Sequence, residues 1–67
     1  MSPRQIGKML KERREVLGLT REQLAKKARV TTAYVSMMEA GKRKNPSLVV
    51  LHRLAKALGV PVTELLG

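Results

Sequence analysis

Apolar residues recur at helical spacing along the chain, in short blocks bounded by capping residues and glycines. In the first block, Ile6, Leu10 and Leu17 keep a helical period, and Gly18 supplies a left-handed C-terminal cap. No useful length of chain alternates with period two, so no strand is predicted. The pattern therefore predicts one all-α domain over residues 1–67, with five helices at about residues 2–17, 20–28, 31–40, 46–58 and 61–66.

The helix boundaries are marked by specific capping sequences. Ser2, Pro3 and Gln5 have the order of a capping box with proline at the first helical position. Thr20 and Gln23 repeat the capping box before the second helix. The remaining boundaries are marked by a cap, a proline or a glycine: Thr31, Gly41, Asn45-Pro46-Ser47, Gly59 and Val60-Pro61.

Two adjacent methionines define the orientation of the third predicted helix. At 100° per residue, Met38 lies beside Val35 on the face that must be the core, whereas Met37 points outward. The outward face has no charge and mostly small side chains, which suits insertion into a DNA major groove, although a single exposed methionine is also ordinary on a protein surface. This outward face consists of Thr32, Ala33, Ser36, Met37 and Ala40.

Composition adds a strong positive charge and excludes several classes of function. Fourteen Lys and Arg against five acidic residues give a formal charge of +9, and twelve of the fourteen lie between Arg4 and Lys44, so a polyanion is the expected partner. The chain has no Cys or Asp, and we interpret its single histidine, His52, as a surface residue. We therefore expect neither an enzyme nor a metal or cofactor site. Without a membrane span, a signal peptide or cysteine, the chain is expected to be soluble and cytoplasmic.

Three segments give the chain a specific resemblance. "LGLTREQLAKKA", "VTTAYVSMMEAGKRKNPSL" and "LHRLAKALGVPVTELL" resemble the Cro/C1-type helix-turn-helix family of phage-repressor DNA-binding domains, and the likeness covers about Ile6 to Leu66. The resemblance implies a compact five-helix bundle in which the second and third helices form the helix-turn-helix. It also implies a transcriptional regulator that binds a pseudo-palindromic operator as a homodimer, in a prokaryotic cell or a phage-infected host.

The resemblance also assigns the residues that would contact double-stranded DNA. The side chains expected to reach base edges are those on the outer face of the third helix: Thr32, Ala33, Ser36 and Met37. The residues expected to contact the phosphate backbone surround that helix: Arg21, Thr31, Tyr34, Lys42, Arg43, Lys44 and Asn45.

Two positions depart from the family pattern, and one ion pair is implied. Arg21 stands where the family usually has Gln, and Arg29 replaces the usual glycine of the turn, so Arg29 is expected to adopt positive φ at a cost of about 1 kcal/mol. The resemblance implies a buried structural ion pair between Arg14 and Glu39, while helical periodicity alone leaves Arg13 and Arg14 as rival partners of Glu39.

The sequence gives weaker signals for a dimer interface or a protein partner than for DNA contacts. Val49, Val62 and Leu66 are candidates for a dimer interface, because they are expected to be exposed near the last helices, where the family most often dimerises. Scattered surface valines would explain the same pattern. The alternative function is an antitoxin or coactivator-type module whose main role is to bind a protein partner.

Overall fold

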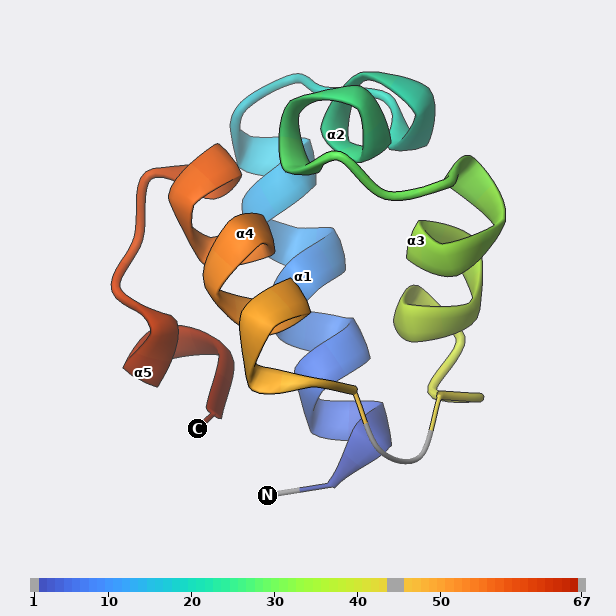
Figure 1. Ribbon diagram of the computed structural model, residues 1–67, viewed down its shortest axis with the longest axis vertical. Helices are drawn as coiled ribbons and strands as arrows, with labels where there is room; N and C mark the ends of the chain where they lie inside the picture. The colour runs from blue at the N-terminus through green and yellow to red at the C-terminus, as the bar shows by residue number, and fades with distance from the viewer. Residues whose placement is uncertain (1, 44–45, 67) are drawn as a thin grey trace.

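A computed structural model describes residues 2–43 and 46–66, and within these ranges the chain forms five α-helices and no strand (Figure 1). None of these helices combines the length and the apolar character needed to cross a membrane. The prediction of an all-α, five-helix domain is confirmed, and each observed helix boundary lies within two residues of the expected one. The helices are α1 (Pro3–Val16), α2 (Arg21–Ala28), α3 (Thr32–Glu39), α4 (Leu48–Leu58) and α5 (Val62–Leu66).

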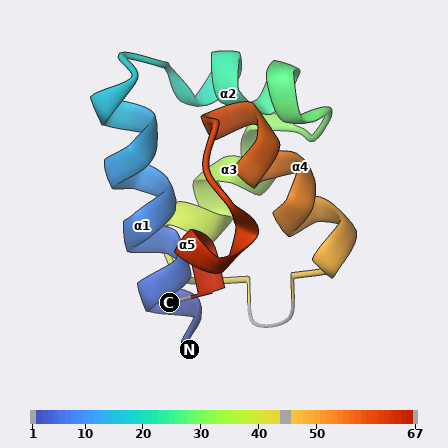
Figure 2. The ribbon, with the colours of Figure 1, turned by 90° about the vertical axis from the view of Figure 1, so that its left-hand side faces the viewer.

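The helices pack around one core, with α2 across one end of the bundle. The long α1 contacts both α3 and α5, whereas α2 packs against α3 and α4. Figure 2 shows the short α5 in front of the bundle, where it contacts α1 and α4. This arrangement leaves the outer side of α3 uncovered by any other helix (Figure 1).

The core consists of aliphatic side chains contributed by every helix. Leu10 of α1, Leu24 of α2, Val35 of α3 and Leu54 of α4 are fully buried, and Leu65 of α5 closes the core from the side. Their burial supplies the hydrophobic stabilisation of a chain that has no disulfide.

The two methionines of α3 have the predicted orientations. The side chain of Met38 is 2% exposed and belongs to the core, whereas Met37 is 40% exposed on the outer face. The orientation of α3 predicted from its periodicity is therefore confirmed.

Both predicted capping boxes are formed. The Ser2 hydroxyl accepts a hydrogen bond from the Gln5 backbone N–H at 3.2 Å, and the Gln5 side chain accepts one from the Ser2 backbone N–H at 3.1 Å. Thr20 and Gln23 make the same reciprocal pair at 3.0 and 2.8 Å. Each box satisfies two backbone donors at its helix start, so it fixes where α1 and α2 begin.

A glycine in α1 allows the close approach of α3, which the sequence analysis did not predict. A Cβ atom built on Gly7 would lie 2.2 Å from the carbonyl oxygen of Met38 and 2.9 Å from that of Glu39. Gly7 is buried, and only a residue without a Cβ lets the end of α3 lie this close to α1.

Leu17 keeps the helical period of Ile6 and Leu10, but the first helix, expected to reach residue 17, ends one residue earlier. α1 ends at Val16, and Leu17 forms its C-cap with 50% of its surface exposed. On the last turn of α1, Arg14 occupies the inward side instead, and it is buried. The apolar face of α1 therefore ends one turn before the helix does.

Candidate nucleic-acid interface

The outer face of α3 is short, exposed and uncharged. Thr31 caps the helix by accepting a hydrogen bond from the Tyr34 backbone N–H at 3.0 Å. Beyond this cap, Thr32, Ala33 and Met37 are exposed and Ser36 is partly exposed. The eight residues of α3 span about 12 Å at 1.5 Å per residue. The outer face of α3 is therefore a short surface that presents hydroxyl, methyl and thioether groups.

Glu39, the one charged residue of α3, points inward and binds two arginines. Arg14 donates to both of its carboxylate oxygens, from Nε to Oε2 at 2.6 Å and from Nη2 to Oε1 at 3.0 Å. Arg21 donates from Nε to Oε1 at 3.0 Å. The Glu39 side chain is 2% exposed, and Arg14 also donates to the Leu19 carbonyl oxygen at 2.8 Å. This Glu39 network joins α1, α2 and α3 at the end of the outer face.

The two arginines keep Glu39 ionised despite its burial. Burial alone would raise the pKa of Glu39, but the hydrogen bonds from Arg14 and Arg21 outweigh it and lower that pKa below the ordinary value. The hydrogen bond that Arg14 donates to Glu39 contributes most to raising the pKa of Arg14. The charges of the network are therefore compensated inside the protein.

Arg13, the rival partner for Glu39, pairs elsewhere. Its Nη2 lies 2.6 Å from Glu64 Oε2, which connects α1 to α5 on the side of the bundle away from α3. Both side chains are more than one third exposed, so this pair contributes little to stability. The two adjacent arginines of α1 thus bind different helices.

Arg21 borders an open hollow beside α3. Its side chain remains 47% exposed although Nε contacts Glu39. The hollow, of about 530 Å³, is also lined by Thr32 and Ser36 of α3, by Lys11 of α1 and by two acidic residues, Glu15 and Glu22. A cation at the first position of α2 thus adjoins two of the hydroxyls that were predicted to contact bases.

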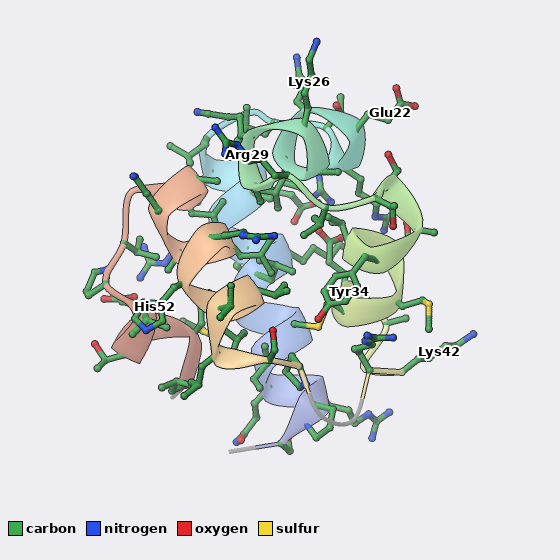
Figure 3. All side chains as sticks on the ribbon, in the orientation of Figure 1. Glu22, Lys26, Arg29, Tyr34, Lys42 and His52 are labelled. Carbon is green, nitrogen blue, oxygen red and sulfur yellow. The ribbon has the colours of Figure 1, made fainter. Side chains whose placement is uncertain are left out.

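A second group of cations follows the C-terminal end of α3. The guanidinium carbon of Arg43 lies 4.6 Å from the centre of the Tyr34 ring, a cation–π contact that fixes Arg43 beside α3. Lys42 is exposed next to it, and Figure 3 shows its side chain pointing away from the bundle. The other two predicted backbone contacts in this loop, Lys44 and Asn45, lie outside the described residues.

Arg4 joins this group, and the sequence analysis did not single it out. A Cβ on Gly41 would lie 3.1 Å from Arg4 Cγ, so the first turn of α1 adjoins the end of α3. Only the packing of α1 against α3 brings Arg4 to this position. No spacing along the sequence indicates the contact.

Arg29 adopts the expected positive φ in the turn between α2 and α3. Its backbone angles are φ 59° and ψ 44°, and it forms the C-cap of α2. The prediction that this position needs a left-handed conformation is confirmed, even though a glycine is absent.

The three candidate dimer residues differ in exposure. Val49 is exposed at the start of α4, next to the exposed Leu48. Val62 and Leu66 are partly buried and pack against the core, so they present less surface than expected. The physical reason is that α5 turns its apolar side onto α1 and α4.

Known proteins share both the sequence and the fold. A profile of the helix-turn-helix family matches residues 10–65. An uncharacterized HTH-type transcriptional regulator from Methanothermobacter thermautotrophicus is 45% identical over 51 residues, which cover 76% of this chain and 72% of that protein.

Two solved structures are similar over nearly the whole chain. The restriction-modification controller protein C.AhdI from Aeromonas hydrophila is 38% identical, with a TM-score of 0.89, and 94% of each chain is covered. SinR, a master regulator for biofilm formation whose crystal structure is a complex with DNA, is 35% identical, with a TM-score of 0.88 over 92% of this chain and 98% of that chain.

Proposed function

The chain belongs to the helix-turn-helix family, in agreement with its Cro/C1-type sequence motifs, and we propose that it regulates transcription by binding a pseudo-palindromic DNA operator as a homodimer. The family is one of DNA-binding regulators and not of enzymes. In this proposal α3 is the recognition helix, α2 lies across the phosphate backbone, and the protein acts in the cytoplasm.

The observation that carries the proposal is the uncharged outer face of α3 between two groups of cations. B-DNA has a major groove about 12 Å wide, and a helix of about 12 Å can enter it end-on or along its length. Arg21 lies beside Thr32 and Ser36 on one side of the face, and Arg43, Lys42 and Arg4 lie where the chain leaves α3. This order of cation, neutral face and cation matches a groove between two phosphate strands.

The side chains of the outer face would read bases by two kinds of contact. The hydroxyls of Thr32 and Ser36 can donate or accept a hydrogen bond at a base edge. Ala33 and Met37 offer only apolar surface, and the C5-methyl group of thymine is the apolar feature of the major groove. We therefore expect thymine in the half-site opposite Ala33 and Met37.

The cations and the helix starts would hold the protein on the phosphates. Arg43 is preorganised by its contact with Tyr34, and Thr31 lies at the start of α3. The backbone N–H groups at the starts of α2 and α4 supply further donors. Two copies joined near Val49 would place two α3 helices in successive major grooves, about 34 Å apart.

Selection of bound duplexes from a random pool tests the proposal, followed by titration of the selected duplex and a scrambled one at several salt concentrations. We expect a pseudo-palindrome bound at least about a thousandfold tighter than scrambled DNA. The salt dependence should correspond to roughly six to ten phosphate contacts per dimer, a slope of about −5 to −9. Equal affinity for every duplex would overturn the proposal and favour a protein partner.

Variants separate base contacts from phosphate contacts. Met37→Ala should weaken binding to the selected duplex by about tenfold and reduce its advantage over scrambled DNA. Val16→Ala removes a more exposed apolar side chain at the far end of α1, and it should change neither affinity. Arg43→Ala should weaken both duplexes alike and reduce the salt slope by about one per protomer.

A further inference from the structure

A second concentration of positive charge lies in a cleft between the C-terminal end of α2 and the side of α4. The cleft holds about 480 Å³, within the range of small ligand sites. Its walls are Lys27, Arg29, Arg53 and Lys56, and alanines complete its lining. We call this feature the basic cleft.

The charge of the basic cleft is not balanced within the described part of the chain. No carboxylate lines it, and none of its four cations forms an ion pair with a described residue. Lys27 and Lys56 lie in the last turns of α2 and α4, where a cation stabilises the helix dipole. This explanation does not extend to Arg53, which lies in the middle of α4.

The backbone conformation of Arg29 gives an independent indication that a positive side chain at the basic cleft has a role. It is the one residue other than glycine with positive φ among the described residues, and that conformation costs about 1 kcal/mol. A glycine would avoid the cost. Its side chain is exposed and lines the cleft, with no hydrogen bond to a described residue that would offset the strain. The strain is thus accompanied by a free cation directed at the cleft.

The basic cleft is separate from the proposed DNA interface. Among residues 2–43 and 46–66, none from α3 or from the loop after it lines the cleft. Figure 3 shows Arg29 near α2 and α4 on one side of the bundle, and Lys42 on the opposite side beyond α3. A duplex bound along the outer face of α3 would therefore leave the cleft open.

We propose that the basic cleft binds an acidic segment of a partner protein. Carboxylates of such a segment would complement the four cations, and its methylene groups would cover Ala28 and Ala57 between them. A concave site of this volume accepts a few side chains, whereas a duplex is too wide to enter and would touch only the rim. The proposal does not depend on operator binding.

The test uses NMR amide shifts and fluorescence anisotropy with a labelled decapeptide of alternating glutamate and alanine, at about 0.1 M salt. The same peptide with glutamine in place of glutamate is the uncharged control. We expect the acidic peptide, and not the control, to shift the amides of residues 27–29 and 53–57. The shifts should persist when the protein is saturated with a DNA duplex.

Two double variants with the same loss of charge make the test specific. Arg53→Gln with Lys56→Gln removes one mid-helix and one last-turn cation of the cleft. Lys8→Gln with Lys26→Gln removes one mid-helix and one last-turn cation elsewhere, since both residues are exposed and Lys26 points away from the cleft (Figure 3). Peptide affinity should fall about tenfold in the first variant and less than about twofold in the second.

Three results would overturn the proposal. An equal loss of affinity in the two double variants would mean that the peptide responds to overall charge. Peptide-induced shifts confined to α3 and the following loop would place it on the DNA interface. Larger cleft shifts with scrambled duplex than with peptide would identify a second DNA contact instead of a protein-binding site.

Discussion

Gly7→Ala is the sharpest test of how α1 positions α3. On propensity alone, alanine in place of a mid-helix glycine should stabilise α1 by about 1 kcal/mol. In the structure, the added methyl group would lie 2.2 Å from the Met38 carbonyl oxygen. The two considerations predict opposite signs, so the direction of the change is informative.

The structure gives a magnitude for the clash. A comfortable carbon–oxygen contact is about 3.3 Å or longer, so the two helices must separate by roughly 1 Å. The opposing atoms belong to the backbone of α3, hence no side-chain rotation can relieve the contact. Overpacking of this kind costs about 1–3 kcal/mol, and separation would also stretch the bonds from Arg14 to Glu39. After the gain in propensity of about 1 kcal/mol is subtracted and the loss from the stretched bonds is added, we expect a net loss of about 2 kcal/mol.

Thermal unfolding followed by circular dichroism measures this loss. For a domain of this size, a loss of 2 kcal/mol lowers Tm by roughly 10 °C. Lys8→Ala, at the adjacent exposed position, is the matched control and should change stability by less than about 0.5 kcal/mol. A higher Tm for Gly7→Ala than for the unmodified protein would refute the close approach of α1 and α3.

Three further predictions concern charge and backbone strain. Glu39→Gln should cost about 3 kcal/mol at neutral pH in a denaturant titration, since it leaves buried Arg14 without its counter-ion; an unchanged midpoint would contradict the network. Because the folded-state pKa of Glu39 is lowered, its stabilisation is complete above its unfolded pKa of about 4.3 and is lost as pH falls through the folded value. The stability difference between the protein and Glu39→Gln should therefore shrink below about pH 4, and a constant difference down to pH 2 would argue against it. Arg29→Gly should raise Tm by roughly 5 °C as it relieves the left-handed strain, whereas a lower Tm would show that the arginine stabilises the turn.

Local sequence signals were sufficient for the helices and their orientation. The capping boxes at Ser2 and Thr20 depend on residues three positions apart, so their geometry follows from the sequence. The same holds for the orientation of α3, because the helical period alone separates Met37 from Met38. For Arg29, comparison with the family pattern was needed, since the sequence letter gives no sign of positive φ.

Features that depend on tertiary packing could not be predicted in this way. Helical periodicity left Arg13 and Arg14 as equal candidates for Glu39, and the position of α5 separates them by bringing Glu64 to Arg13. Leu17 keeps the helical period but lies beyond the end of α1, where no helix covers it. The basic cleft combines residues of α2 and α4 that are more than twenty positions apart, so charge counts along the chain do not reveal it.

The contacts around α3 suggest how a face without long polar side chains can be selective. Hydroxyl and apolar contacts have short reach, so in the proposed complex Thr32 and Met37 would discriminate between bases only with α3 held at a fixed depth in the groove. Gly7 and the Glu39 network fix one side of α3 against α1 and α2. Gly7 and Glu39 would thus position α3, and Met37 would contact bases. Changes at Gly7 or Glu39 that leave the protein folded should therefore weaken binding to all duplexes, whereas changes at Met37 should alter which duplex is preferred. A loss of preference without loss of affinity in a Gly7 variant would contradict it.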